Sequence, residues 1–227
     1  ASSAPGALAL HTTHNGTHGQ REAIVSVGDA APLDREQLGD VVNATLTLTD
    51  HGTPPLASHR TFLIDLRDIN DNTPAFSPST PAQVSVSELS PYGTVVAQLS
   101  ASDADAGENG RVTFAAGGAA ASDPLFPFGV SANGEVTLLT TLDYETQQQY
   151  HLTVVAFDHG SPSLQATHNL TLNVLDANDN QPVFSPRGYT VSISEAAAVG
   201  TPLNVSLRAT DADTVASKLV FSLVDST

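Results

Sequence analysis

The amino-acid sequence predicts an all-β fold of tandem Greek-key β-sandwiches, on the basis of three observations. Residues 45–49, 84–87 and 170–174 alternate apolar and polar side chains with a period of two, as half-buried strands do. Whole motifs recur in the same order about 108 residues apart, which indicates repeated copies of one domain. No segment shows a sustained period of 3.6 residues, so helices are not expected to dominate the fold.

Three further segments complete the expected strands. Residues 150–157 are rich in Val, Tyr and Phe, and residues 191–194 alternate in the same way as residues 84–87. Asn133-Gly134 stands between two apolar segments, which predicts a tight β-hairpin there. About ten residues more than in the next copy separate Asn15-Gly16 from Leu33, and we expect them to form a long loop.

The repeat divides the chain into one whole copy and two parts of copies. Residues 1–72 read as the C-terminal part of one domain, residues 73–180 as a complete domain of about seven strands, and residues 181–227 as the N-terminal part of a third. Neither part carries all the strands that a closed sandwich needs. The paired motifs begin at Leu33 and Leu142, Leu48 and Ala156, Asp68 and Asp176, Ser87 and Ser194, and Ala101 and Ala209.

Composition excludes several classes of function. The net charge is −16, from 24 acidic and 8 basic residues, whereas nucleic-acid and anionic-membrane surfaces require clustered Lys and Arg. There is no Cys, so disulfides and Cys-based zinc sites are excluded. No run of 18 apolar residues is present, so no segment is expected to span a membrane.

Four N-x-[ST] triplets favour an extracellular protein that carries N-linked glycans. Each triplet is a weak signal alone, because such spacing arises by chance, but four in 227 residues point in one direction. The candidate acceptors are Asn15, Asn43, Asn169 and Asn204.

The acids gather in short clusters that suit a hard cation. Asp103-Ala-Asp105 can converge two carboxylates, and Asn70-Asp-Asn72 adds a carboxylate, amide oxygens and backbone carbonyls. Calcium takes six to eight oxygen ligands in irregular geometry. Such clusters also make turns, but their recurrence in order favours calcium. The pattern is not a helix-loop-helix calcium site, because Glu108 stands where the loop glycine would be.

Together, these motifs resemble the extracellular cadherin repeat. They are Ser87-Glu-Leu, Asp103-Ala-Asp, Leu142-Asp-Tyr-Glu, Phe157-Asp-His-Gly and Asp176-Ala-Asn-Asp-Asn-Gln-Pro. The resemblance implies seven-stranded, immunoglobulin-like sandwiches whose linkers bind up to three Ca²⁺ ions at each junction. It also implies calcium-dependent adhesion, homophilic or heterophilic, by the extracellular part of a single-pass plasma-membrane protein whose anchor lies outside this stretch. The motifs look more like those of Fat- and Dachsous-type cadherins or protocadherins than like classical cadherins.

The resemblance also assigns calcium ligands, residue by residue, to two junctions. The first junction would use Asp34, Glu36, Asp68, Asn70, Asp71, Asn72, Asp103, Asp105 and Asp158, with backbone carbonyls of Ile69, Asn72 and Asn109. The second would use Glu88, Asp143, Glu145, Asp176, Asn178, Asp179, Asn180, Asp211 and Asp213, with backbone carbonyls of Ala177 and Asn180.

Charge supports a stiffening role for these ions. Each junction gathers seven acidic side chains, which repel one another when no cation is bound. Three divalent ions would nearly neutralise them and cross-link neighbouring domains. We therefore expect calcium to turn a jointed chain into a stiff rod.

Three other functions remain open at this point. Paired carboxylates can serve a hydrolase, but here they recur at each domain boundary, and no nucleophile or phosphate-binding motif accompanies them. His11, His14 and His18 could bind zinc. The chain could also be a passive spacer within a long ectodomain. The sequence has no Trp, so strand exchange through these residues is not expected. The resemblance implies that the partner is another cadherin ectodomain, the same or different, with no nucleic acid or small-molecule substrate.

Overall fold

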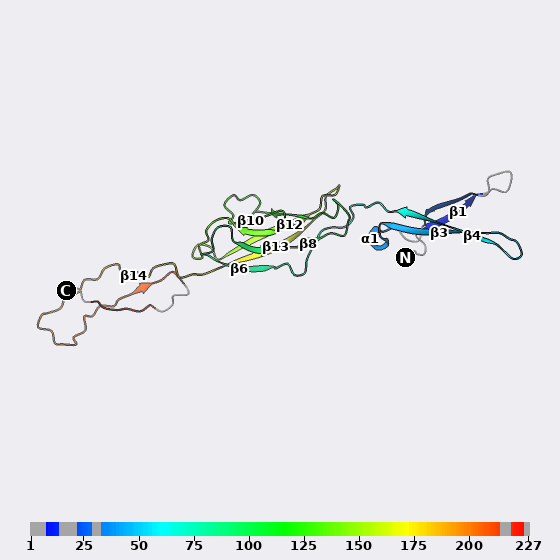
Figure 1. Ribbon diagram of the computed structural model, residues 1–227. Helices are drawn as coiled ribbons and strands as arrows, with labels where there is room; N and C mark the ends of the chain where they lie inside the picture. Colours follow the sequence, from blue (N-terminus) through cyan, green and yellow to red (C-terminus); the bar gives the residue numbers. More distant parts are fainter. Residues whose placement is uncertain (1–7, 14–21, 29–32, 214–218, 225–227) are drawn as a thin grey trace. The chain divides into compact units, whose positions relative to one another are not determined.

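The computed structural model describes residues 8–13, 22–28, 33–213 and 219–224. The chain divides into two compact units, which are described separately. Figure 1 labels helices and strands of both. The first unit comprises Ala1–Pro74, Ser102–Val112 and Asp158–Leu164, and the second comprises Ala75–Ala101, Thr113–Phe157 and Gln165–Thr227. Among the described residues, β-strands predominate, in agreement with the predicted all-β class.

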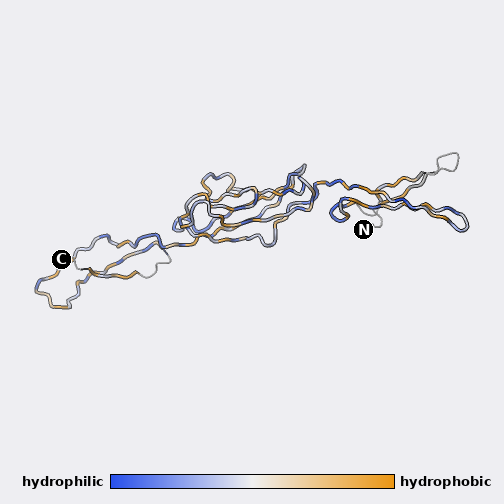
Figure 2. Tube along the Cα trace, viewed as in Figure 1, coloured by the Kyte–Doolittle hydropathy of each residue, from blue (hydrophilic) through white to orange (hydrophobic). Residues whose placement is uncertain are grey.

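Among the described residues before Pro74, the first unit contains two antiparallel hairpins and one short helix. Strand β1 (Leu8–Thr13) pairs with β2 (Glu22–Val27), and β3 (Val41–Thr49) pairs with β4 (Ala57–Asp65). Between the hairpins, α1 (Arg35–Leu38) forms a single turn. Residues 45–49 of β3 alternate Thr and Leu, as predicted, and Figure 2 shows hydrophobic and hydrophilic positions mixed along the trace of these strands.

The expectation of a long loop before Leu33 is wrong in part, because residues 22–27 form strand β2. This segment contains Ile24, Val25 and Val27, which favour strands and pair with β1 in a continuous antiparallel register. The predicted loop missed this strand because the copies differ in length here, so the repeat gave no template.

A four-stranded sheet forms one layer of the second unit. Its order is β6 (Gln83–Ser87), β13 (Gln165–Leu175), β12 (Gln149–Phe157) and β9 (Thr113–Gly117). Strand β6 runs parallel to β13, whereas the other neighbours are antiparallel. Strands that are distant in sequence are thus neighbours in the sheet, as a Greek-key connection requires.

A three-stranded sheet forms the second layer, in the order β10 (Phe128–Val130), β11 (Glu135–Leu138) and β7 (Val95–Gln98). Strands β10 and β11 pair across Asn133-Gly134, which confirms the predicted hairpin. Gly134 has φ +85°, and a Cβ there would lie 2.6 Å from the Leu99 carbonyl oxygen, so only glycine fits the turn.

The core of the second unit is built from the inward-facing residues of both sheets. Val154 and Leu172 come from the four-stranded sheet and Val136 and Leu138 from the three-stranded sheet, and all four have 0% of their surface exposed. Burial alternates along β11 and β13, so polar residues point outward. The two layers therefore enclose one sandwich core.

We expect Val154→Ala to lower the free energy of unfolding by about 2 kcal/mol, because it removes two buried methyl groups and leaves a cavity. Val95→Ala is the matched control, since Val95 lies on β7 with 54% of its surface exposed. Urea denaturation of both variants tests this. Equal losses in the two would contradict the assignment of Val154 to the core.

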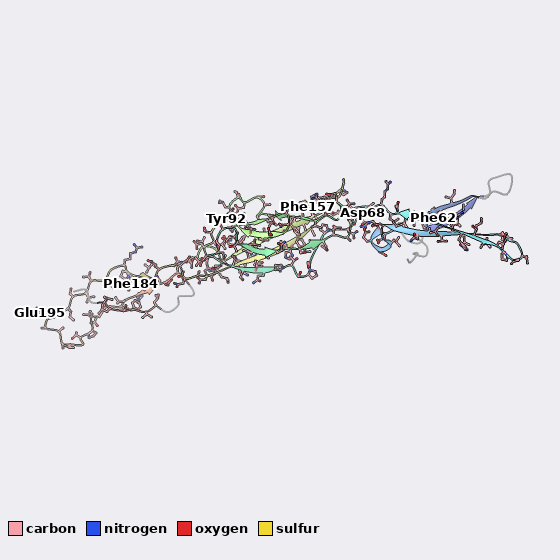
Figure 3. The ribbon with its side chains drawn as sticks, viewed as in Figure 1. Phe62, Asp68, Tyr92, Phe157, Phe184 and Glu195 are labelled. Atoms are coloured by element: carbon pink, nitrogen blue, oxygen red, sulfur yellow. The ribbon has the colours of Figure 1, made fainter. Side chains whose placement is uncertain are left out.

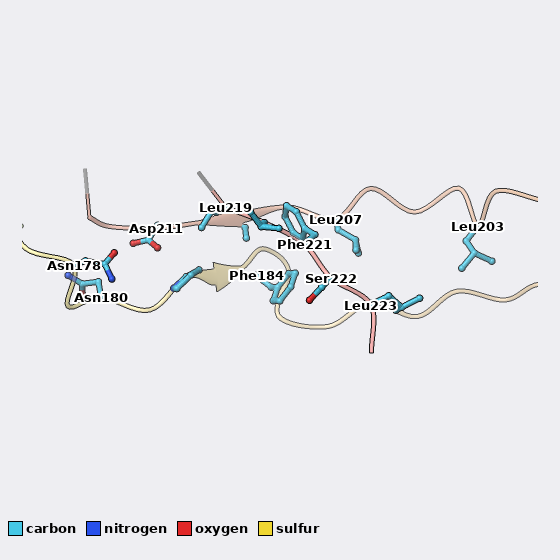
Figure 4. A pocket seen from close by; sticks show the side chains of 13 residues that line it. Asn178, Asn180, Phe184, Leu203, Leu207, Asp211, Leu219, Phe221, Ser222 and Leu223 are labelled. Atoms are coloured by element: carbon cyan, nitrogen blue, oxygen red, sulfur yellow. The ribbon is translucent and has the colours of Figure 1, made fainter. Parts of the chain in front are cut away.

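The third copy has little regular structure among its described residues. Short strands β14 (Val183–Phe184) and β15 (Ala209–Thr210) pair with each other, just as β5 (Ala75–Phe76) and β8 (Ala101–Ser102) are short elements of the complete copy. Figure 4 shows Phe184, Leu207 and Phe221 lining an apolar pocket in this segment.

The strand predicted at residues 191–194 is not present. The equivalent residues of the complete copy lie in β6, which is held by its parallel pairing with β13. No counterpart of β13 follows among the described residues of the third copy. Ile193 is accordingly 52% exposed, so the alternating pattern alone does not form a strand without a partner.

Candidate metal centres

The first acidic cluster consists of seven carboxylates carried by four segments of the first unit. Two lie at the start of α1, two in residues 68–72 after β4, two just after β8 and one just after β12. They are Asp34, Glu36, Asp68, Asp71, Asp103, Asp105 and Asp158. Figure 3 labels Asp68 on the segment of residues 68–72, which we call the first linker.

Three of these carboxylates converge directly. Oxygen atoms of Glu36, Asp71 and Asp105 all lie within 4.8 Å of one another. Asn72 fixes Asp105, because its backbone N–H donates to Oδ2 at 3.1 Å and its side-chain amide donates to Oδ1 at 2.6 Å. Asp105 is only 8% exposed, so the linker holds a nearly buried charge in place.

Asp68 is held by three hydrogen-bond donors. It accepts hydrogen bonds from the Ala106 N–H at 3.1 Å, the Asn109 amide at 2.8 Å and Arg35 Nε at 2.5 Å. Burial alone would raise the pKa of Asp68, but these donors and the Arg35 charge outweigh it and lower that pKa. Asp68 is therefore an anion at neutral pH.

Asp158 reaches the linker through Asn70. Its Oδ2 accepts a hydrogen bond from the Asn70 amide at 3.1 Å, while the backbone N–H groups of Gly160 and Leu164 each donate to Oδ1 at 3.0 Å. Burial opposes ionisation, yet these bonds lower the pKa of Asp158. A Cβ at Gly160 would lie 2.2 Å from Asn70, so the His-Gly motif needs glycine to admit this side chain.

The second acidic cluster repeats the arrangement in the second unit. Oxygen atoms of Glu145, Asp179 and Asp213 lie within 4.8 Å of one another, as do those of Glu88, Glu145 and Asp176. The first of these trios is the sequence equivalent of Glu36, Asp71 and Asp105. The cluster consists of Glu88, Asp143, Glu145, Asp176, Asp179, Asp211 and Asp213, and residues 176–180 are the second linker.

The hydrogen bonds recur as well as the carboxylates. The Asn180 backbone N–H donates to Asp213 Oδ2 at 3.1 Å, and its amide donates to Asp213 Oδ1 at 2.8 Å. Asp213 N–H donates to Asp211 Oδ1 at 3.1 Å, as Asp105 N–H donates to Asp103 Oδ1 at 2.9 Å. The same sequence motif therefore forms the same hydrogen-bond network in both clusters. Figure 4 shows Asn178, Asn180 and Asp211 grouped at one end of the pocket.

Glu88 joins the complete copy to the second linker. It is 5% exposed, and it accepts hydrogen bonds from the Tyr144 N–H at 2.6 Å and from the Ala177 N–H at 2.7 Å. Both carboxylate oxygens are therefore anchored by backbone, which orients Glu88 toward Glu145.

Ionisation is disfavoured at Glu145 and Asp179. Burial is the largest cause, and repulsion from Glu88 and Asp213 adds to it, so the pKa of each carboxyl is raised. Folding without metal therefore favours the protonated forms of these two groups. Glu145 and Asp179 therefore stabilise the folded state at low pH, and this contribution is lost as pH rises through their raised pKa values. Asp68 behaves in the opposite way: its contribution to the stability of the folded state is lost as pH falls through its lowered pKa.

We therefore expect protons to compete with calcium more strongly at the second cluster than at the first. Calcium titrations followed by calorimetry near pH 7 and near pH 5 test this, with Glu145→Gln as a variant that removes one titrating group. A second-cluster affinity that does not weaken at the lower pH would contradict the raised pKa values.

The donor set fits calcium. All converging side chains offer oxygen, which hard divalent cations prefer. Asn70 Oδ1 and Asp103 Oδ2 are buried and accept no hydrogen bond among the described residues. Buried oxygens without a donor are costly, and a bound cation would satisfy them. The residues present therefore suit Ca²⁺ at both linkers.

Several predicted ligands have other roles in the structure. Asp34 caps α1 by accepting from the Gln37 N–H at 2.9 Å. Asp143 accepts from the Thr146 hydroxyl at 2.9 Å and from the Thr146 N–H at 3.0 Å, and these two bonds lower the pKa of Asp143. The carbonyls of Ile69 and Ala177 accept from the N–H groups two residues ahead, each at 3.0 Å. A carbonyl with one hydrogen bond still has a lone pair for a cation.

Asparagine amides in these motifs act first as donors to carboxylates. Asn72 and Asn180 bind Asp105 and Asp213, and the Asn109 side chain binds Asp68. Sequence reasoning treated them as oxygen ligands and missed this bracing role. It also missed Arg35, which contacts the first cluster; only its position between two predicted ligands pointed to it.

The remaining predicted sites lie on the surface or outside the described residues. Asn43 on β3, Asn169 on β13 and Asn204 are exposed, so all three could be reached by a glycosylating enzyme. Asn15, His14, His18 and the side chain of His11 lie outside the described residues. No helix among the described residues has the length and apolarity to cross a membrane.

Comparison with known proteins identifies the domain. Residues 82–175 match the Cadherin domain family. The chain is 40% identical over 164 residues to human Protocadherin-1, covering 72% of this chain and 15% of that protein. It is 43% identical over 185 residues to human Cadherin EGF LAG seven-pass G-type receptor 3, covering 81% of this chain and 5% of that protein. The chain thus spans a small part of the relatives it matches.

Solved cadherin structures also resemble this chain. The protocadherin gammaB7 EC3-6 cis-dimer structure aligns with a TM-score of 0.74 at 29% identity, covering 91% of this chain and 51% of that one. Mouse Cadherin-23 EC22-24 aligns with a TM-score of 0.65 at 26% identity, covering 94% of this chain and 68% of that one. The fold, the paired acidic clusters and these matches together show that the chain belongs to the cadherin superfamily, a family of non-enzymatic, calcium-binding cell-adhesion proteins.

Proposed function

We propose that this stretch of ectodomain supports calcium-dependent cell–cell adhesion, with calcium ions bound at its linkers between repeats. The recurrence of one carboxylate trio, within 4.8 Å in each copy, is the observation that carries the proposal. An active site would occur once, whereas a structural joint recurs with the repeat. The acids are therefore best explained as parts of joints.

Residues 1–72, 73–180 and 181–227 would then belong to three successive repeats, with the two linkers as their joints. Each joint would take up to three Ca²⁺ ions. The trio of Glu36, Asp71 and Asp105 supports one ion at the first joint, and the two trios that share Glu145 support two at the second. The other predicted ligands would complete these sets.

The chain's own residues prepare each joint for a cation. Asn72 and Asn180 hold a nearly buried Asp of the following copy against the linker, while Glu36 and Glu145 approach from the preceding copy. Carboxylates from two copies thus share one small volume, where they repel one another. Bound calcium supplies the positive charge that turns this repulsion into a cross-link.

The proposed partner is another cadherin ectodomain, identical or different, on a neighbouring cell. The matched protocadherin gammaB7 structure is described as a cis-dimer, which supports contacts between cadherin ectodomains. We place the chain outside the cell, on a plasma-membrane protein that crosses the membrane once. One relative is named as a seven-pass receptor, so a topology measurement on the full-length protein tests the single crossing.

Bead aggregation tests the adhesive function. Beads coated with the whole ectodomain that contains this chain should aggregate in millimolar calcium and disperse in chelator. The same ectodomain carrying Asp105→Asn and Asp213→Asn should aggregate less at equal calcium. Calcium-stiffened protein that never aggregates, alone or with other cadherin ectodomains, would instead identify a passive spacer.

A further inference from the structure

Arg35 is a basic residue that forms ion pairs with two members of the first acidic cluster, Glu36 and Asp68. Its Nε donates to Asp68 Oδ1 at 2.5 Å, its Nη1 donates to Asp40 at 3.1 Å, and its Nη2 pairs with Glu36. Nη2 also donates to the Ala104 carbonyl oxygen at 3.1 Å. The side chain is 15% exposed, so most of the guanidinium is removed from water.

These contacts join three segments that are far apart in sequence. Arg35 belongs to α1, Asp68 to the first linker, and Ala104 to the loop that carries the Asp-Ala-Asp motif. Asp68 continues the connection, because its Oδ2 accepts from the Ala106 N–H and from the Asn109 amide. One arginine therefore ties the linker to residues 104–109 through protein contacts alone.

The second cluster has a different residue at the equivalent position. Leu33-Asp-Arg-Glu in the first copy corresponds to Leu142-Asp-Tyr-Glu in the second, so Tyr144 replaces Arg35. In the second cluster, Glu145 converges with two further carboxyl groups, those of Glu88 and Asp176. In the first, the equivalent Glu36 is paired with a guanidinium. The tyrosine brings no positive charge to this position.

We propose that Arg35 is a built-in counter-ion that keeps the first linker attached to residues 104–109 when calcium is scarce. The second linker, with Tyr144 at this position, then loses its order at a higher calcium concentration than the first. This inference rests on the proposed calcium-binding function and adds that the two joints respond to calcium in sequence.

Charge and geometry explain why an arginine suits this role. Guanidinium stays protonated at any physiological pH and presents several donors in one plane, so it can bind two carboxylates and a carbonyl together. Charge-assisted hydrogen bonds in a partly buried site are stronger than neutral ones and are less screened by salt. Glutamine at this position would keep a donor but lose the charge.

Amide hydrogen exchange of the 227-residue chain, read by mass spectrometry in chelator and in millimolar calcium, tests the proposal. The reporters are the Asn72 N–H, bound to Asp105, and the Ala106 N–H, bound to Asp68. The variants are Arg35→Gln, Arg35→Lys and Tyr144→Arg. Arg111→Gln is the matched control, because Arg111 pairs with Glu108 at 2.7 Å on the surface, where both side chains are more than half exposed.

In chelator, we expect Arg35→Gln to speed exchange at these amides about tenfold, as loss of a charge-assisted hydrogen bond predicts. Arg35→Lys should fall between Gln and wild type, and Arg111→Gln should match wild type. In calcium, wild type and the three arginine variants should exchange at the same rate. Tyr144→Arg should slow exchange in residues 176–180 in chelator.

Two outcomes would overturn the proposal. One is equal exchange in wild type and Arg35→Gln in chelator, and the other is an acceleration in Arg35→Gln that persists unchanged in calcium. A chain whose linkers gain no protection from calcium would contradict the proposed function instead, so the two failures can be told apart.

Discussion

Millimolar calcium is expected to raise the unfolding midpoint of this chain, and a chelator is expected to reverse the rise. Calcium modules of extracellular proteins bind with dissociation constants on the order of 0.1 to 1 mM. At 10 mM calcium, an ion that binds only the folded state then adds about 1.4 to 2.7 kcal/mol to the free energy of unfolding. With ions at both linkers, the gain is comparable to the largest single side-chain effect discussed here.

Calorimetric melting in calcium, in chelator and in magnesium checks this prediction. Magnesium requires near-octahedral ligands at shorter distances, so it should stabilise the chain less than calcium at the same concentration. Asp105→Asn combined with Asp213→Asn should remove most of the calcium effect, since each Asp belongs to one trio. Identical midpoints in calcium and chelator would contradict the account.

Glu88→Ala is expected to destabilise the second unit by about 2 to 5 kcal/mol. It leaves the Tyr144 and Ala177 N–H groups without their acceptor. A fully buried unsatisfied donor costs about 1 to 3 kcal/mol, and these two are partly buried, so their sum lies below the upper limit. It also removes one carboxylate from a metal trio, so the variant should gain less from calcium than wild type does.

Glu195→Ala is the matched control for this prediction. Glu195 is the sequence equivalent of Glu88 in the third copy, but it is exposed (Figure 3). Urea denaturation in calcium and in chelator separates the structural and metal-linked effects of Glu88→Ala. If both variants lost the same stability in both conditions, the bracing role of Glu88 would be refuted.

The sequence was most informative where chemistry is local and repeated. The hairpin at Asn133-Gly134 follows from two adjacent residues, because their turn geometry is set by the backbone. The acidic trios could be anticipated because Asp71 and Asp105 recur as Asp179 and Asp213 at one offset. Because the acids recur at equivalent positions, they could be told apart from acids that only form turns, which a single copy would not have allowed.

Features that depend on distant partners could not be predicted in the same way. Residues 191–194 alternate as well as residues 84–87 do, yet only the latter have a neighbouring strand to pair with. Arg35 meets Ala104, 69 residues away, and no local pattern indicates that contact. Asn72 likewise carries oxygen and nitrogen on one amide, and only the fold decides which one faces Asp105.

A crystal structure of the chain grown in millimolar calcium tests the central claim most directly. The account predicts an ion at each linker, bound at about 2.4 Å by carboxylate oxygens from both sides of that linker. Glu36, Asp71 and Asp105 should share one ion, and Glu145, Asp179 and Asp213 another. Well-ordered linkers in which these six carboxylates turn to water and bind no calcium would contradict it.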